Sequence, residues 1–323
     1  MRGFTTLGLT IVQCYPDTNP FDATPPIWNL SPLPLAAEQY DTQAVREAAR
    51  AAADSSGYNP FYGAYGTCPL ALYDYGILTA NLPPITYTAP PPLEHLVLSS
   101  PLEFLEAINP TGNTVVFKVR AGERICLLKV FRDREVSMFG YRKPEERPTH
   151  PLKRFAREKL AYEHLLRFGA CDKGAVPRCF GWLELTAEER DSLVTLPNLT
   201  DQWHHLHKDD GLPKALLLEY IDDAEQMTID SITLERADKA LRALYHIHAA
   251  HVLHNDVHGR NILVGSGGRV VWIDFDAART VNQSTESRPV GRRELQCELA
   301  NTWEQLYNTM LTDKRIGFRS WLE

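Results

Sequence analysis

A short polar segment, His254-Asn-Asp-Val-His-Gly-Arg-Asn261, restricts the fold of this chain more than any other feature of the sequence. Periodic apolar residues predict a long helix over 234–250 directly before it. Two short apolar runs follow it, joined by the turn Gly265-Ser-Gly-Gly268. Two strands joined in this way bring Asn261 and Asp274 side by side, and oxygen atoms of an amide and a carboxylate can bind a divalent cation.

The composition bounds the class of protein. The chain has 323 residues, 44% of them hydrophobic and 23% charged, which is ordinary for a globular protein. A net charge of −7 disfavours nonspecific nucleic-acid binding, and no apolar run reaches the about 20 residues that span a bilayer. The six cysteines form no C-x-x-C pair, so we expect reduced thiols in a cytoplasmic protein rather than a secreted one.

The first part of the chain differs from the rest. Residues 1–100 hold 13 of the 22 prolines and only three basic residues against eight acidic ones. Segments such as 88–92 cannot continue a helix or a central strand, although the alanine-rich residues 36–53 predict a helix. We therefore expect residues 1–92 to form a proline-rich, partly irregular arm.

Regular periodicity from residue 93 onward predicts an α+β region. The expected order is three strands, one helix, two strands and then mostly helices. Strands are expected over 102–108, 114–119, 124–131, 176–185 and 215–221, short strands over 261–264 and 270–275, and helices over 155–168, 234–250 and 293–311. Residues 186–213 are a polar stretch with no predicted element.

The segment from His254 to Asn261, followed by Asp274-Phe-Asp276, resembles the catalytic and metal-binding loops of the protein-kinase-like superfamily. The resemblance implies a bilobal fold, with a five-stranded antiparallel N-lobe that has one key helix and a reduced helical C-lobe. The corresponding domains are the arm at 1–92, the N-lobe and hinge at 93–221, and a truncated C-lobe at 222–323.

The same resemblance assigns roles. Asp256 would orient and deprotonate the acceptor hydroxyl, Asn261 and Asp274 would hold Mg²⁺, and His254 would brace the loop. Lys129 is a lone charge in an apolar strand, so it needs a carboxylate partner. Glu158 and Glu163 both lie on the next helix, and the frame E-x-x-A-Y favours Glu158.

The segment 216–221 resembles the hinge between kinase lobes. Leu218 would then be the gatekeeper, and the backbones of Glu219 and Ile221 would bond the adenine edge. Leu127 and Leu263 would sandwich the adenine ring. In a plain reading these apolar side chains are core residues, and the sequence does not separate the two interpretations.

Several residues depart from the pattern of regulated protein kinases. Gly112 is the only glycine of the segment 109–114, where a glycine-rich phosphate loop is expected. Asn255 replaces an arginine, His258 stands where Ser/Thr kinases carry a lysine, and Asp276 replaces a glycine. The form H-x-D-x-H-x-x-N, together with Asp276, resembles aminoglycoside, choline and lipopolysaccharide kinases.

The resulting prediction is an ATP- and Mg²⁺-dependent phosphotransferase that moves the γ-phosphoryl group to an unknown hydroxyl-bearing acceptor, a small molecule or an atypical substrate. No nucleic acid and no membrane span are expected. One alternative is a Ser/Thr protein kinase, with Ser284 and Thr285 as autophosphorylation sites. Another is a nucleotide-binding pseudokinase or scaffold, which the poor glycine loop and the proline-rich arm favour.

Overall fold

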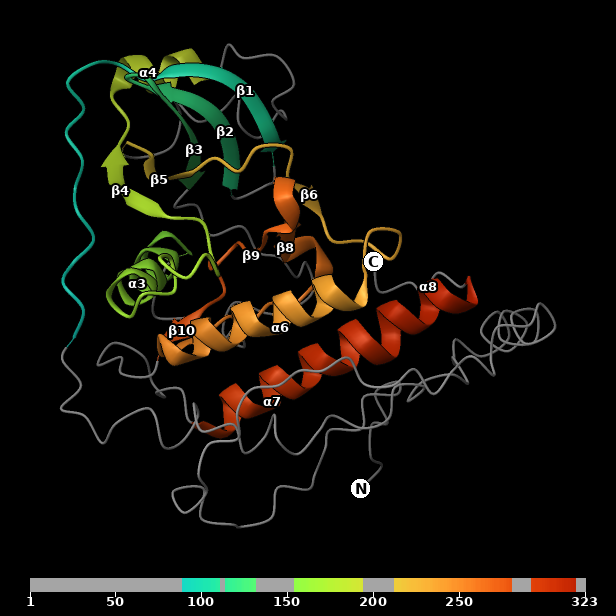
Figure 1. Ribbon diagram of the computed structural model, residues 1–323. Helices are drawn as coiled ribbons and strands as arrows, with labels where there is room; N and C mark the ends of the chain where they lie inside the picture. The colour runs from blue at the N-terminus through green and yellow to red at the C-terminus, as the bar shows by residue number, and fades with distance from the viewer. Residues whose placement is uncertain (1–88, 111–113, 132–153, 194–211, 281–291, 318–323) are drawn as a thin grey trace, which may run out of the picture.

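The computed structural model describes residues 89–110, 114–131, 154–193, 212–280 and 292–317. A five-stranded sheet lies at one end and the longest helices lie at the other (Figure 1). All neighbouring strands of this sheet are antiparallel, in the order β1-β2-β3-β5-β4. Its strands are β1 (Glu103–Pro110), β2 (Thr114–Ala121), β3 (Arg124–Phe131), β4 (Cys179–Glu184) and β5 (Lys214–Glu219). The predicted five-stranded antiparallel sheet in a mixed α and β fold is thereby confirmed.

Apart from α3 and α4, the remaining elements come after the five sheet strands in the chain. The helix α3 lies beside the sheet, and α6 and α7 pack against each other (Figure 1). The helices are α3 (Arg154–Arg167), α4 (Ala187–Leu193), α6 (Leu234–Ala249), α7 (Arg292–Trp303), a π-helical segment (Glu304–Leu311) and α8 (Thr312–Ile316), with 3₁₀ turns at Gly259–Asn261 and Ser266–Gly268. The short strands are β6 (Glu225–Gln226), β7 (Val252–Leu253), β8 (Ile262–Val264), β9 (Val270–Trp272) and β10 (Arg279–Thr280).

The two faces of the sheet pack against different apolar clusters. Side chains alternate along a strand, so Leu128 and Val130 of β3 face the smaller cluster, which includes Leu193 of α4. Leu127 and Phe131 face the larger cluster, which contains residues of α3, α6 and α7. Lys129 has the same parity as Leu127 and Phe131, so the strand directs it toward the α3 side of the sheet.

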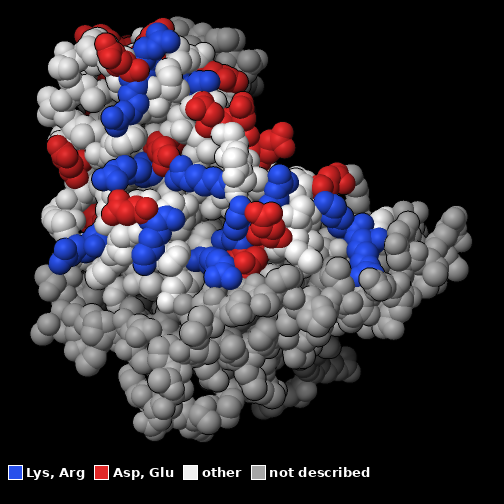
Figure 2. All heavy atoms as spheres, viewed as in Figure 1, with Lys and Arg blue, Asp and Glu red and all other residues white. Residues whose placement is uncertain are grey.

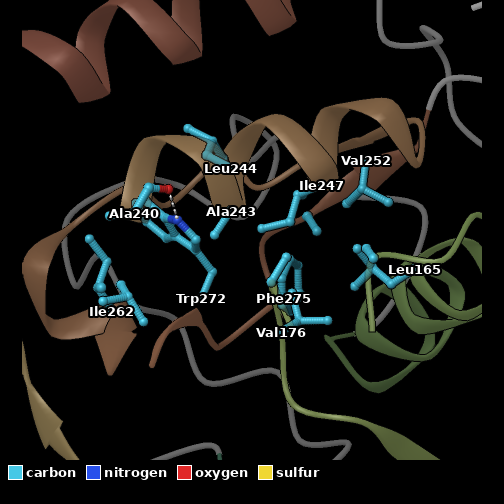
Figure 3. Packing of buried hydrophobic residues seen from close by; sticks show 14 of the residues in the cluster. Leu165, Val176, Ala240, Ala243, Leu244, Ile247, Val252, Ile262, Trp272 and Phe275 are labelled. Carbon is cyan, nitrogen blue, oxygen red and sulfur yellow. Dashed lines mark hydrogen bonds between the residues drawn. The ribbon is translucent and has the colours of Figure 1, made fainter. Parts of the chain in front are cut away.

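The larger cluster is continuous from α3 to the helices below the sheet. Trp272 of β9 points toward α6 and donates its Nε1–H to the carbonyl oxygen of Ala240 at 2.8 Å (Figure 3). Ile247 of α6 and Phe275 lie next to it, and Leu165 brings α3 into the same cluster (Figure 3). The indole N–H is therefore satisfied inside an apolar core, as a buried tryptophan requires.

The polar stretch 186–213 contains a helix that the sequence analysis missed. Thr186 Oγ1 accepts the backbone N–H of Glu189 at 3.1 Å, and the Glu189 carboxylate accepts the N–H of Thr186 at 2.8 Å. This reciprocal cap begins α4, and the pattern T-x-x-E is readable in the sequence. The predicted order, in which two strands follow the first helix directly, is corrected, because α4 lies between β4 and β5 and covers the opposite face of the sheet from α3.

Other boundaries also shift. The predicted strand 176–185 begins at Cys179, two residues after Pro177, which has no N–H to donate. The last predicted helix continues to Ile316 through a π-helical segment and ends at Gly317, whose φ of 67° suits glycine. The two-residue strands β6, β7 and β10 were not predicted from the sequence. The predicted helix 36–53 and Gly112 lie outside the described residues, as do Ser284 and Thr285.

Charged side chains on the face seen in Figure 2 are mixed in sign. Lys and Arg side chains form a band across the middle of this face, with Asp and Glu side chains between them (Figure 2). Ion pairs among the described residues include Lys239 with Glu235 and Arg242 with Asp238. Within the described ranges, no helix has the length and apolar character that a membrane span needs.

Candidate active site

Three charged side chains from distant parts of the chain meet on the α3 side of the sheet. Lys129 Nζ lies 2.5 Å from Glu158 Oε2 and 2.6 Å from Asp274 Oδ1. The Lys129 and Glu158 side chains are 6% and 1% exposed, whereas Asp274 is 37% exposed. The ammonium group therefore bridges a fully buried carboxylate and one that reaches the surface. We call these three residues the Lys129 cluster.

The electrostatics of the Lys129 cluster follow from its burial. Burial alone would lower the pKa of Lys129, but the two carboxylates raise it above its usual range, so the ammonium stays protonated. Burial also favours a raised pKa for Asp274, yet Lys129 outweighs that effect and lowers it. Burial raises the pKa of Glu158, with Lys129 opposing the change.

The other acid considered for Lys129 is used elsewhere. Glu163 Oε1 accepts a hydrogen bond from Lys159 Nζ at 2.6 Å and another from the backbone N–H of Leu93 at 2.9 Å. It therefore ties α3 to the segment that precedes β1. The choice of Glu158 over Glu163 agrees with this geometry.

Asp256 lies in the loop between β7 and the 3₁₀ turn, with its side chain 26% exposed. Asn261 Nδ2 donates to Asp256 Oδ2 and to its backbone oxygen, both at 2.8 Å. Arg260 Nη2 lies 3.0 and 3.2 Å from the two carboxylate oxygens, and His258 Nε2 lies 3.3 Å from Oδ1. The carboxylate is thus held in one orientation by three side chains of its own loop.

Glu298 of α7 anchors this loop, and the sequence did not predict this contact. The Glu298 carboxylate of α7 accepts the backbone N–H groups of His254 at 3.0 Å and Asn255 at 2.6 Å. His248 Nε2 lies 2.7 Å from the same carboxylate. Burial would raise the pKa of Glu298, but the His248 contact lowers it overall, so the group accepts as a carboxylate.

His254 links the loop to the segment that carries Asp274. Its Nε2 lies 3.0 Å from the carbonyl oxygen of Ile273, and the Ile273 N–H donates to the carbonyl of Asn261 at 2.9 Å. Burial lowers the pKa of His254, so its ring is neutral at neutral pH. Asn261 is therefore bonded through its backbone to Ile273, the residue that precedes Asp274.

Backbone conformations at the site are unusual for non-glycine residues. Asn255 has φ of 64° and Asp274 has φ of 68°, both in the left-handed region. Such conformations cost about 1 kcal/mol or more each and persist where the surroundings impose them. Asp276 accepts a hydrogen bond from Arg154 Nη1 at 2.5 Å, so this residue ties the segment after β9 to the start of α3.

The predicted hinge residues lie at and beyond the end of β5. Leu218 is 6% exposed and is the cross-strand partner of Leu127 on β3. Leu263 and Ile221 are half-buried, on β8 and just after β5 respectively. Leu218 belongs to the larger apolar cluster, which agrees with its interpretation as a core residue.

Glu219 has contacts that the sequence analysis missed. Its carboxylate receives two hydrogen bonds from Arg269, at 2.5 and 3.0 Å, and one from the N–H of Arg178 at 3.0 Å. The Glu219 N–H donates to the Arg178 carbonyl at 2.8 Å, so that N–H is not available to a ligand. Arg269 and Arg178 together lower the pKa of Glu219, with the Arg269 hydrogen bond as the main cause.

The oxygen atoms at this site suit Mg²⁺. Asn261 Oδ1 and Asp274 Oδ2 make no hydrogen bond to any described residue, and both are hard donors. Among the described residues, no group of three or more His, Cys, Asp or Glu could hold a metal by itself. A magnesium ion here would depend on water and phosphate oxygens for its remaining ligands, as is usual for Mg²⁺ with nucleotides.

No family model and no curated protein matches the chain. Among solved structures, it is similar to one described as vaccinia related kinase 3, at 13% sequence identity and a TM-score of 0.36. The match covers 61% of this chain and 54% of the other, so it spans about half the length of that structure.

Proposed function

We propose that this protein is an ATP- and Mg²⁺-dependent phosphotransferase with a bilobal kinase-like organisation, in which residues 1–92 are an arm, 93–221 the N-lobe and hinge, and 222–323 a reduced C-lobe. The observation that carries the proposal is the Lys129 cluster, in which Lys129 contacts both Glu158 and Asp274. Burial of an ammonium group has a desolvation cost, and charged groups held in this way are concentrated at functional sites.

Each residue has a role that its contacts allow. Lys129, positioned by Glu158, would exchange its contact with Asp274 for phosphate oxygens of the nucleotide. Asp274 and Asn261 would hold Mg²⁺ through their free oxygens, and the bound ion would neutralise charge on the phosphates. Asp256 would orient the acceptor hydroxyl and take its proton as the oxygen attacks the γ-phosphorus. The adenine contacts would come from Leu127, Leu218, Ile221, Leu263 and the carbonyl of Glu219.

The acceptor is a small molecule in this proposal, and the protein acts in the cytoplasm. Four cysteines of the described segments are free thiols, and Cys126, Cys171 and Cys179 are buried, which suits a reducing compartment. Burial raises the pKa of Cys171 to about 12, so this thiol is not a nucleophile.

The decisive test compares Asp256→Asn and Asp274→Asn with the unmodified chain. Both should lower release of ADP from ATP by about a hundredfold or more, because one removes the base and the other a magnesium ligand. Asp274→Asn should also remove the extra thermal stabilisation that Mg²⁺ adds to that from ATP, while Asp256→Asn should keep it. The exposed Asp223→Asn is the matched control and should keep full turnover. Full turnover in both site variants would reject the proposal.

A nucleotide-binding scaffold is the second candidate. Arg260 already occupies both oxygens of Asp256, at 3.0 and 3.2 Å, which keeps the carboxylate from a substrate unless Arg260 moves. ATP-dependent stabilisation without any ADP release across a broad set of alcohols would favour this scaffold.

A further inference from the structure

A cavity of about 110 Å³ adjoins the Asp256 loop. Three segments line it: residues 226–229 after the hinge, residues 258–260 of the Asp256 loop, and the π-helical segment through Gln305, Thr309 and Met310. A cavity of this volume holds a ligand about the size of a benzene-like molecule.

The cavity shares two residues with the immediate surroundings of Asp256. His258 and Arg260 both line it, and both contact the Asp256 carboxylate, at 3.3 and 3.0 Å. A ligand in the cavity is therefore separated from the carboxylate by a single layer of side chains. The position fits the body of an acceptor whose hydroxyl reaches Asp256 once the Arg260 side chain moves off the carboxylate.

The loop backbone packs directly on the cavity floor. A Cβ added to Gly259 would lie 2.6 Å from the Met227 carbonyl oxygen and 3.3 Å from Met310 Cε. No side chain fits between the loop and these residues, so the glycine allows the close approach. The cavity and the Asp256 loop thus form one packed unit.

The chemistry of the lining discriminates between ligands by charge. Met227, Ile229 and Met310 are at most 7% exposed and provide an apolar floor. The polar groups are hydroxyls, amides and one imidazole, and none of the described lining residues is an aspartate or a glutamate. The guanidinium of Arg260 is already paired with Asp256. A cationic ligand would lose its water here without gaining a carboxylate partner, which is unfavourable.

We propose that this cavity receives the acceptor and that the acceptor is an uncharged alcohol with a compact apolar body. The inference rests on the proposed phosphotransferase function and narrows its substrate class. The alcohol oxygen forms a bond to the γ-phosphorus, the bond from that phosphorus to the ADP oxygen breaks, and the alcohol proton passes to Asp256.

Two probes of matched shape test the charge preference. Choline and 3,3-dimethylbutan-1-ol are both primary alcohols, and they differ by exchange of a cationic nitrogen for carbon. We expect saturation-transfer NMR on the nucleotide-free protein to show the neutral alcohol binding about tenfold or more tightly, a difference of about 1.4 kcal/mol. Equal or tighter binding of choline would overturn the inference and leave the phosphotransferase proposal intact.

Two variants test the location. Gln226→Trp and Gln305→Trp each fill the cavity from a different wall, and each should reduce binding of 3,3-dimethylbutan-1-ol at least about tenfold. Ser266→Trp places the same side chain at an exposed position outside the lining and should bind as the unmodified chain does. Unchanged binding in both cavity variants, with thermal melting showing that they are folded, would overturn the assignment. ADP release is measured separately and bears on the phosphotransferase proposal alone.

Discussion

Glu158 and Glu298 are both buried carboxylates at the candidate site, yet their partners differ. Glu158 contacts one ammonium group, that of Lys129, which is itself shared with Asp274. Glu298 contacts two backbone N–H groups and the His248 ring. The Lys129 and Glu158 side chains can both be replaced by apolar ones, and no fully buried polar side chain then remains without a partner. The backbone N–H groups that contact Glu298 cannot be removed in this way. The comparison teaches that a buried acid stabilises a fold more securely when its partners are backbone groups.

The largest effect is expected from Glu298→Ala. It leaves the buried N–H of His254 and the partly buried N–H of Asn255 without an acceptor, so we expect a loss of about 4 kcal/mol in the free energy of unfolding. Urea denaturation measures it. Glu298→Gln keeps one acceptor oxygen and should lose about half as much, and the exposed Asn301→Ala should stay within about 0.5 kcal/mol of the unmodified chain. A loss below 1 kcal/mol for Glu298→Ala would contradict the anchoring role.

Lys129→Met tests the other side of the comparison. It leaves Glu158 buried without a cation, and we expect a loss of about 3 kcal/mol in the free energy of unfolding. The double variant Lys129→Met with Glu158→Leu removes both charges and should recover at least about 1 kcal/mol of that loss by the same measurement. ATP should stabilise neither the single variant nor the double variant, because both lack Lys129. Recovery of nucleotide binding in the double variant would contradict a phosphate role for Lys129.

The buried His164 tests the effect of burial on a titratable group through the pH dependence of the free energy of unfolding. Burial lowers the pKa of His164 to about 4, with the Ala250 carbonyl opposing the change and His251 adding to it. The unfolded chain, with a histidine pKa of about 6.5, takes up the proton first as the pH falls. Stability from this group is therefore complete above about pH 6.5 and is lost progressively toward pH 4.

His164→Gln should remove this part of the pH dependence. Between pH 7 and pH 4.5, we expect the variant to lose about 2 kcal/mol less unfolding free energy than the unmodified chain. Urea denaturation at each pH measures the two slopes. A slope for His164→Gln identical to that of the unmodified chain would refute the assignment.

The smallest effect is expected for a partly buried ion pair, that of Arg269 with Glu219. Arg269 and Glu219 side chains are 34% and 30% exposed and make two parallel contacts. A double-mutant cycle with Arg269→Gln and Glu219→Gln should give a coupling of about 1 kcal/mol. The same cycle on the exposed pair Arg120 and Glu103 should give a coupling close to zero. Equal couplings would show that burial does not set the strength of these pairs.

Much of the described fold was predictable because its signals are local. Alternation predicted β2 and β3 within two residues, and the amphipathic run at 234–250 predicted α6 almost to its end. The helix α4 was missed, although its capping pattern from Thr186 to Glu189 is local and readable. The short strands β7 and β10 were not predictable, since two residues carry no period and exist only through their pairing with each other.

The same distinction holds for the candidate site. A lone lysine in an apolar strand implied a carboxylate partner, and the spacing of Asn261 and Asp274 implied that they lie together. Glu298 was missed, because a single glutamate on an amphipathic helix has no mark that its partners are backbone groups 43 and 44 residues away. The contact of Glu219 with Arg269 was missed for the same reason.

By itself the sequence determined the order of the longer elements except α4, the face of β3 that carries Lys129 and the identity of the polar loop, since each depends on periodicity or on spacing within a few turns of chain. The tertiary structure alone decided which acid meets which base, which carboxylate anchors the loop and which uncharged side chains surround the cavity beside it. These contacts join residues far apart in the chain, and only the packing of the sheet against the helices determines which of them come within hydrogen-bonding distance.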